Sequence, residues 1–317
     1  MICLAMDYNY FKKYRYDKPE ELTGLELYDC LITAFVDSER VKTAAAVIPC
    51  KERWWICDPD TEIPGGLEGS RRFQIGEDED GGVSAALTDA RYGHICIDIT
   101  GFCAPQLLVL LHFLHVKGFK KIDFIYTEPN QYKDNEHTQF SEGFTAVKQV
   151  YGYRGSHTAN MDRDLLILAA GYDHSWIIQV AIAKKSAKKV LLFGFPPTSP
   201  GMFQENILRV HQAETAVGEN CFINMDWNIY APANDPFSTA QALNEYMVKQ
   251  KKLRPTNVYF APLSSKPQAL GMALYYIWET KDDPMKEWSI LFPFCKKYLH
   301  NTTSGIARFW RYEVELP

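Results

Sequence analysis

The polar residues best suited to chemistry lie in short loops that directly follow apolar, β-branched runs. Ser264-Ser265-Lys266-Pro267 offers two hydroxyls, an ammonium and the N–H groups of a helix start, a combination that suits a phosphate. The same residues also fit an ordinary helix start, with Ser as N-cap and Pro in the first turn. The loop therefore supports an anion-site hypothesis and a purely structural one.

Acid–base chemistry has three candidate residues, Asp173, His174 and Glu128. Asp173 and His174 follow the apolar run at 165–170, and an adjacent carboxylate and imidazole can move protons on a substrate where their side chains converge. Glu128 follows the run at 121–126. The structural alternative is that Asp173 caps the next helix and His174 is a polar first-turn residue.

Two more loops of the same kind supply polar side chains. Asp37, Ser38 and Arg40 follow the run at 30–36, and Asn234-Asp235 precede Pro236 at a helix start. A capped helix start explains each loop without a ligand, and a ligand-facing corner is the alternative. The candidate ligand-binding residues are therefore Asp37, Ser38, Arg40, Asn234, Asp235, Ser264, Ser265 and Lys266.

Several signatures of known chemistry do not occur in the sequence. It contains no GxxxxGK[ST] loop, no GxGxxG and no GxSxG elbow, which disfavours P-loop NTPases, dinucleotide oxidoreductases and the common serine hydrolases. The eight cysteines form no CxxC pair, and His112 and His115 lie in an apolar helix with no acid on their face. We predict no metal site, and the sequence identifies no cofactor.

The elements that position these loops alternate between short apolar runs and longer helical patterns, which is typical of βαβ units. We predict an α/β fold with a largely parallel, Rossmann-like, doubly wound sheet and an antiparallel edge at the C-terminus. The final run, 306–316, alternates polar and apolar residues and should form that edge. We expect one buried sheet to hold most of the runs at 30–36, 95–99, 121–126, 165–170, 189–195 and 257–261.

At 317 residues the chain is long enough for one large or two intimately packed α/β units. No linker marks a boundary, so the division near 1–160 and 161–317 is tentative. Two stretches, 59–82 and 128–163, are predicted to be loop-rich because they are polar and rich in Gly, Asn or charged residues.

Composition bears on partners and location. A net charge of -5 makes nucleic acid an unfavoured partner, and the basic clusters at 184–189 and 249–254 are explained by helix ends. No apolar stretch suggests a signal peptide or membrane span, and widely spaced cysteines are typical of a cytoplasmic protein. An aromatic content of 14% without a catalytic signature favours a protein partner or homo-oligomer.

Three stretches resemble uncharacterised bacterial Rossmann-like proteins associated with antiphage defence loci: CLITAFVDSERV (30–41), DITGFCAPQLL (98–108) and residues 231–276. The resemblance includes no catalytic motif, so it implies a biological context and no residue roles.

The leading hypothesis is a component of a prokaryotic antiviral defence module, which binds a nucleotide-like or phosphorylated ligand and passes that state to a protein partner. One alternative is a hydrolase or nucleoside-processing enzyme that uses Asp173, His174 and Glu128. Another is a structural subunit of a complex.

Overall fold

The computed structural model describes residues 7–132, 141–218, 228–250, 253–283, 286–299 and 302–317. The chain packs into two units. Unit 1 holds the described residues within Met1–Tyr10 and Thr138–Tyr298, and unit 2 holds those within Phe11–His137 and Leu299–Pro317. Residue 160, the tentative division, lies inside unit 1. Among the described helices, none is long and apolar enough to cross a membrane.

Unit 2 is built on a seven-stranded sheet with strand order β1-β13-β6-β5-β2-β3-β4. Its elements in chain order are β1 (Lys12–Tyr16), α1 (Pro19–Leu22), β2 (Tyr28–Ala34), α2 (Glu39–Val47), β3 (Cys50–Ile56), β4 (Arg71–Phe73), α3 (Val83–Ala90), β5 (Ile95–Asp98), α4 (Ala104–Val116), β6 (Lys121–Tyr132) and β13 (Thr303–Glu315).

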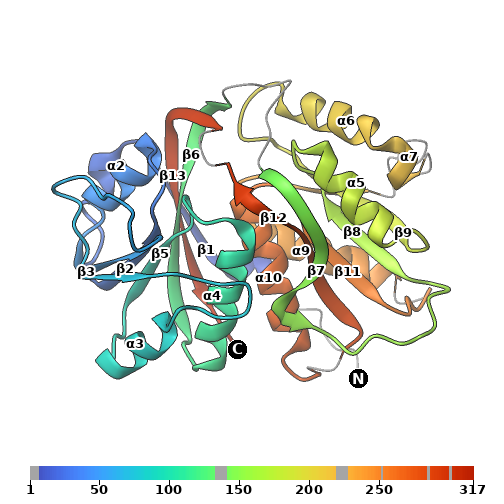
Figure 1. Ribbon diagram of the computed structural model, residues 1–317, viewed down its shortest axis with the longest axis horizontal. Coiled ribbons are helices and arrows are strands. Elements are labelled where there is room, and N and C mark those ends of the chain that lie inside the picture. Colours follow the sequence, from blue (N-terminus) through green and yellow to red (C-terminus); the bar gives the residue numbers. More distant parts are fainter. Residues whose placement is uncertain (1–6, 133–140, 219–227, 251–252, 284–285, 300–301) are drawn as a thin grey trace. The chain divides into compact units, whose positions relative to one another are not determined.

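The strands β2 to β6 of this sheet are all parallel, and the first of them, β2, lies in the middle. The chain moves outward to β3 and β4, then returns to the other side of β2 to form β5 and β6. Helices α2 and α4 lie on opposite sides of the sheet (Figure 1). This is the doubly wound, Rossmann-like arrangement that the alternating pattern predicts.

Unit 1 repeats this order in a six-stranded sheet, β10-β9-β8-β11-β12-β7. Its elements are η1 (Tyr8–Tyr10), β7 (Ser141–Arg154), β8 (Leu165–Ala169), α5 (His174–Ala183), β9 (Lys188–Gly194), α6 (Met202–Gln212), α7 (Glu214–Val217), β10 (Ile229–Ala231), α9 (Pro236–Gln250), β11 (Val258–Pro262), α10 (Lys266–Thr280) and β12 (Trp288–Tyr298). Here β8 is the central first strand, with β9 and β10 on one side and β11 and β12 on the other.

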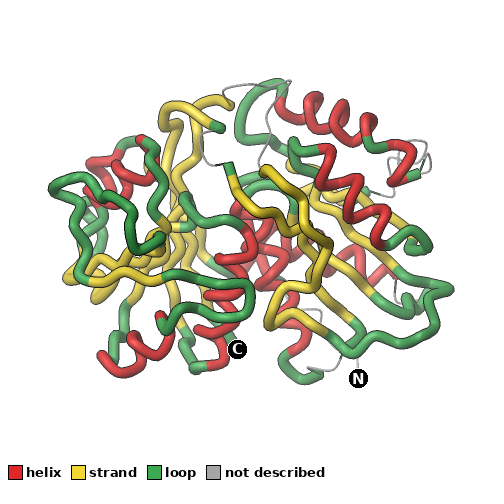
Figure 2. The backbone as a smooth tube through the Cα atoms, viewed as in Figure 1, coloured by secondary structure: helices red, strands yellow, loops and turns green. Residues whose placement is uncertain are grey.

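The two sheets exchange their antiparallel strands. β7 follows β6 in the chain but pairs with β12, the fifth parallel strand of unit 1. β13 follows β12 but pairs with β6, the fifth parallel strand of unit 2, and β1 then pairs with the free side of β13. β7 and β13, with 14 and 13 residues, are among the longest strands, and Figure 2 draws them in yellow. Each sheet is therefore completed by a strand that is remote in sequence from its partner.

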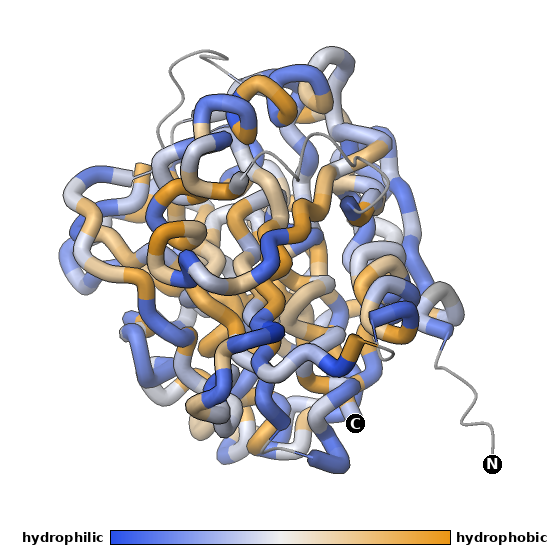
Figure 3. Tube along the Cα trace, turned by 90° about the vertical axis from the view of Figure 1, so that its right-hand side faces the viewer, coloured by the Kyte–Doolittle hydropathy of each residue, from blue (hydrophilic) through white to orange (hydrophobic). Residues whose placement is uncertain are grey.

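Apolar burial explains the central elements. All five residues of β8 and of β11 are buried, as a strand covered on both faces requires. Most of α10 is also buried, and Tyr8 stacks on its Trp278 with ring centroids 4.9 Å apart. In Figure 3 the orange, apolar segments gather along interior elements, while blue segments mark many outer loops. The packed strands hold the loops at their ends in fixed positions.

The predicted fold class is confirmed, but the number of sheets, the place of β13 and the structure of residues 141–154 differ from the prediction. The six apolar runs contribute strands, but the runs at 30–36, 95–99 and 121–126 belong to one sheet and those at 165–170, 189–195 and 257–261 to another. β13 is antiparallel as predicted, although it lies between β1 and β6 rather than at the edge. The predicted loop 128–163 contains all of β7, whose side chains are mostly exposed or half-buried. Its polar sequence therefore lacks the apolar signal of a buried strand.

The strand exchange predicts that the chain cannot be divided at residue 160 into independent domains. Fragment 1–160 lacks β13, and fragment 161–317 lacks β7. We expect each fragment alone to be unfolded or aggregated, because an unpaired strand edge and its apolar face are exposed. Co-expression should restore a folded complex, measured by circular dichroism and cooperative urea unfolding. A fragment that unfolds cooperatively by itself would contradict this interpretation.

Candidate functional site

Each unit has one place where the strand order reverses, between β2 and β5 in unit 2 and between β8 and β11 in unit 1. In open α/β sheets the loops at the carboxyl ends of such strands diverge and line a ligand crevice. Most of the candidate residues lie at these two reversal points or in the loops next to them.

In unit 1 the reversal point brings together two of the loops chosen from sequence. Ala169 at the end of β8 is paired with Pro262 at the end of β11, so Asp173-His174 and Ser264-Ser265-Lys266 leave from neighbouring strands. Gly171 brings the loops into contact, because a Cβ placed on it would lie 1.8 Å from the Leu263 carbonyl oxygen. Only glycine allows this approach of the two backbones.

Hydrogen bonds join these loops to two others. The Ser265 hydroxyl donates to the Ala233 carbonyl, and the Ala233 N–H donates to the Pro196 carbonyl oxygen over 3.0 Å. Gln268, one turn into α10, donates to the Ala231 carbonyl oxygen over 3.2 Å. The loops that follow β9, β10 and β11 are therefore linked, and the loop after β8 packs against them through Gly171.

Several polar side chains at this reversal point cap the N-termini of helices. Asp173 accepts from the Ser175 and Trp176 N–H groups at the start of α5, and Asp235 accepts from Phe237 and Ser238 at the start of α9. Ser265 accepts from the Gln268 N–H of α10 over 3.3 Å. The structural alternative for these three residues is therefore correct, and any ligand role would be additional to capping.

The other candidates of this loop set are half-buried. His174 is the first residue of α5, and Lys266 is the first residue of α10. Ser264 and Asn234 flank the capping residues and are also half-buried. Ser264 and Lys266 together keep a hydroxyl and an ammonium at the N-terminus of a 15-residue helix.

In unit 2 the predicted residues have separate roles. Asp37 is exposed and forms an ion pair with Lys42 at 2.5 Å, while Ser38 caps α2 through the Val41 N–H. Arg40 points inward and donates to the Thr127 carbonyl oxygen and to the Thr303 hydroxyl, both over 2.8 Å. Arg40 thereby ties α2 to the neighbouring strands β6 and β13.

The sequence interpretation missed the buried carboxylate next to Arg40. Asp98 ends β5 and is fully buried, accepting from the Thr33 hydroxyl over 3.1 Å and the Thr100 N–H over 3.0 Å. Burial raises the pKa of Asp98, while these hydrogen bonds and the Arg40 charge oppose that rise. A single acid at the end of an apolar run, HICID, was the available signal.

Glu128 is also committed to structure. It is buried, and it accepts from the Trp310 indole N–H over 2.6 Å and lies 3.5 Å from the Arg308 guanidinium. Glu128 belongs to unit 2, whereas Asp173 and His174 belong to unit 1. These contacts explain how the Glu128 carboxyl group is buried without assigning it a substrate.

A second polar network, also absent from the sequence interpretation, lies at the amino ends of the unit 1 strands. His157 Nε2 is 3.0 Å from the Ser289 hydroxyl, and its Nδ1 is 3.2 Å from the Asn257 side-chain oxygen. Asn257 also donates to Asp164 over 2.7 Å. The Ser–His–Asn order resembles a nucleophile, base and orienting residue.

Burial argues against nucleophilic catalysis by this network. Ser289 and Asn257 are almost completely buried, so a substrate carbonyl has no access to the Ser289 hydroxyl. Gly155 shows how closely the loop packs, because a Cβ there would lie 2.1 Å from the carbonyl oxygens of Lys286 and Trp288. The network therefore fastens the loop before β8 to the starts of β11 and β12.

Comparisons with known proteins identify no family for this chain. No family model matches the sequence, and no curated protein matches it. Among solved structures, the chain is similar to CobK precorrin-6A reductase, with 14% identity and a TM-score of 0.24. That likeness covers 84% of this chain and 90% of the reductase. Within the described ranges, no group of three or more His, Cys, Asp or Glu residues is placed to hold a metal ion.

The contact at Gly171 predicts that the substitution Gly171→Ala destabilises unit 1. A methyl group 1.8 Å from the Leu263 carbonyl oxygen must push the two loops apart, at a cost of about 1–3 kcal/mol. Urea unfolding measures this change in the free energy of unfolding. Gly24→Ala is the control, because its nearest neighbour would be 3.5 Å away. Equal stability of the two variants would contradict the proposed close contact.

The His157 network predicts a stability that depends on pH. Burial lowers the pKa of His157, and the nearby Lys184 lowers it further, against the opposing effects of Asn257, Asp164 and Glu287. The unfolded chain therefore binds more protons between the folded pKa and about 6.5. The stabilisation that depends on neutral His157 should be fully present above about pH 6.5. It should be lost as the pH falls from there through the pKa of His157 in the folded protein.

Urea unfolding at a series of pH values tests this expectation against the variant His157→Gln, which should lose less stability on acidification than the wild type. His211→Gln, which changes an exposed histidine of the same unit, should leave the slope unchanged. If the free energy of unfolding depends on pH in the same way in the wild type and in His157→Gln, His157 does not cause the pH dependence.

Proposed function

We propose that the protein binds a nucleotide-like, phosphorylated small molecule at the carboxyl edge of the unit 1 sheet. The observation that supports this most is the junction of loops at the β8–β11 reversal point, where Gly171 contacts the Leu263 carbonyl. The hydrogen bonds from Ser265 and Ala233 to neighbouring loops make the junction a fixed frame. Such a frame suits a ligand because little conformational freedom is lost on binding.

The distribution of charge suggests how the ligand would be oriented. Asp173 and Asp235 occupy the starts of α5 and α9, so those helix ends are not available to an anion. The start of α10 instead has Lys266 and Ser264, and we assign the phosphate to these residues. The carboxylates of Asp173 and Asp235 would accept hydrogen bonds from the hydroxyl groups of a sugar, as carboxylates do in other Rossmann-like folds.

In the proposed role, the frame stays fixed while ligand binding shifts the population of conformations in the protein around it, and a protein partner or a second copy of the chain recognises the bound state. We place this role in a prokaryotic antiviral defence module. The support for that context is the resemblance of residues 30–41, 98–108 and 231–276 to proteins of such loci. The described cysteines are all free thiols, which supports a cytoplasmic location.

Lys266→Ala tests the assignment of the phosphate. Calorimetry with a panel of nucleotides should show binding to the wild type and a loss of roughly 1.5–3 kcal/mol in the variant, the scale of a charge-assisted hydrogen bond. His174→Ala should bind normally. Lys185→Ala is the matched control, because it removes an exposed lysine beyond the far end of α5.

The same samples separate this proposal from the enzyme and the structural-subunit hypotheses. Product analysis by mass spectrometry would favour an enzyme if the wild type converts a nucleotide and His174→Ala loses about 100-fold or more in turnover with binding retained. A wild type that neither binds nor converts any nucleotide would contradict ligand binding and leave the structural-subunit hypothesis.

A further inference from the structure

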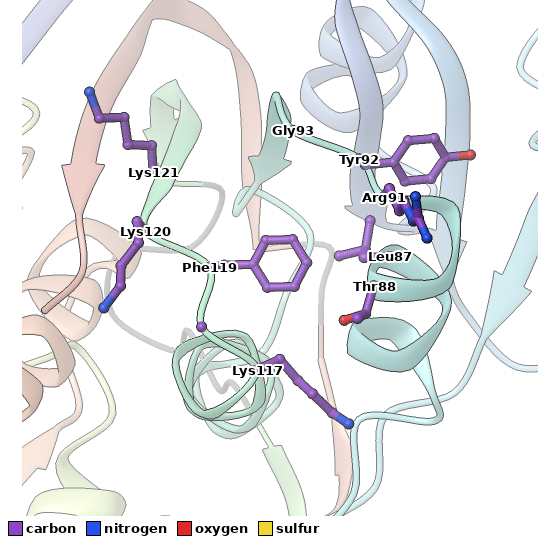
Figure 4. A pocket seen from close by; sticks show the side chains of 10 residues that line it. Leu87, Thr88, Arg91, Tyr92, Gly93, Lys117, Phe119, Lys120 and Lys121 are labelled. Carbon is purple, nitrogen blue, oxygen red and sulfur yellow. The ribbon is translucent and has the colours of Figure 1, made fainter.

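A pocket of about 440 Å³ lies in unit 2, at the opposite end of its sheet from the β2–β5 reversal point. One wall is the end of α3, with Leu87, and the other is the turn between α4 and β6, with Phe119. Figure 4 shows the Phe119 ring directed toward Leu87, with Arg91 and Tyr92 on the α3 side. Phe119 therefore gives the pocket an aromatic surface, in a volume suited to a small ligand.

The charge of this pocket is one-sided. Arg91, Lys117, Lys120 and Lys121 line it, and no acidic residue does, in a chain whose net charge is -5. Lys121 pairs with Glu315 at 3.5 Å, and Lys120 donates to the Pro317 carbonyl. These two lysines point away from Phe119 in Figure 4. Arg91 and Lys117 form no ion pair or side-chain hydrogen bond with any residue that the structure describes.

The backbone of Arg91 is also unusual. Arg91 ends α3 in the left-handed conformation, with φ of 54°, and is one of two non-glycine residues with positive φ in the described chain. Glycine is the usual residue at such a position, and a side chain there costs of order 1 kcal/mol. The turn thus accepts a small destabilisation in order to present a guanidinium at the rim of the pocket.

Helix geometry offers a simpler explanation for part of this pattern. Arg91 and Lys117 each lie at the end of a helix, α3 and α4, where the dipole favours a cation. That effect explains a positive charge at each end. It does not explain why the two charges flank one apolar pocket with an aromatic ring between them, or why Arg91 occupies a position that favours glycine.

We propose that this pocket binds a small organic anion that combines an aromatic ring with a phosphate or similar group, of the size of a nucleoside monophosphate. The ring would pack on the half-buried Phe119, and the negative group would lie between Arg91 and Lys117. This site belongs to unit 2 and is separate from the phosphate position proposed at Lys266 in unit 1.

AMP, adenosine and inorganic phosphate are the three probes that test the site in the full-length protein. AMP carries both the ring and the charge, so it should bind with a Kd on the order of 0.1–1 mM and more tightly than either part. Amide signals of Gly93, Gly118 and Phe119 in ¹H–¹⁵N spectra report on this pocket. Raising the NaCl concentration from about 0.05 M to about 0.5 M should weaken the AMP response.

Arg91→Gly is the decisive variant, because it removes the guanidinium and relieves the strained backbone. It should be at least as stable as the wild type while AMP binding at this pocket weakens by about three- to fivefold, as expected for an exposed ion pair. Lys117→Gln should weaken binding similarly. Lys12→Gln, which removes an exposed cation elsewhere in unit 2, should have no effect.

The outcome is independent of the function proposed for unit 1. Lys266→Ala should leave the shifts at Gly93, Gly118 and Phe119 unchanged, whether or not it affects signals near Gly171. The inference is overturned if AMP produces no shift at these three residues, if adenosine or phosphate alone binds as tightly as AMP, or if Arg91→Gly binds AMP like the wild type.

Discussion

The exchange of antiparallel strands between the two sheets is the constraint on which the rest of the structure depends. In each unit the fifth parallel strand would present an open edge, and that edge is paired by β13 in unit 2 and by β7 in unit 1. An unpaired edge of buried, apolar strands is prone to aggregation. Each unit is therefore complete only when the other part of the chain has been made, and the loops at neither reversal point can be positioned without both parts.

The parallel order within each sheet then determines where chemistry can take place. A reversal beside the central strand separates successive helices onto opposite faces, so the loops between them part at the carboxyl ends. Both reversal points contain a glycine beside a neighbouring backbone. Gly171 approaches the Leu263 carbonyl, and Gly101 approaches the Ala34 carbonyl, with a Cβ at Gly101 lying 2.0 Å from that oxygen. The repeated close approach indicates that the packing of these loops results from the topology of the fold.

Helix capping limits what the reversal point of unit 1 can bind. Asp173, Asp235 and Ser265 satisfy the first N–H groups of three helices, and each is a residue type chosen from sequence because it sits at a helix start. The same position therefore produces both the structural and the functional interpretation. The two interpretations can be told apart at residues that do not form the cap, which is why the phosphate is assigned to Lys266 and Ser264.

The sequence predicts the buried part of the fold well because its signals are local. Apolar runs such as 165–170 and 257–261 need no knowledge of their partners to be recognised as strands. β7 and β1 could not be recognised in this way, because their polar residues form strands only through pairing with β12 and β13, far away in the chain. The exchange itself and the division into two sheets depend on these same long-range pairings.

The candidate sites show the same division between local and long-range information. Asp173 and Ser265 were identified by their place after apolar runs, whereas the Asp98 and His157 networks consist of contacts among residues distant in sequence. Asp98 alone in HICIDI is indistinguishable from a strand-end turn residue. Its hydrogen bond to Thr33 on the neighbouring β2 makes it part of a buried polar cluster.

The basic residues show the same difference between local and long-range information. The basic clusters at 184–189 and 249–254 are conspicuous in the sequence, yet Lys184 lies over the Tyr259 ring at 3.7 Å, and Lys188 and Lys189 belong to strand β9. Arg91 and Lys117 occupy helix ends; Arg91 stands alone in the sequence, and Lys117 is followed by Lys120 and Lys121. What distinguishes them is that two separate helices end beside one apolar pocket. The number of neighbouring cations in a sequence is therefore a poor guide to anion binding, because affinity depends on whether charges from separate elements converge on one pocket.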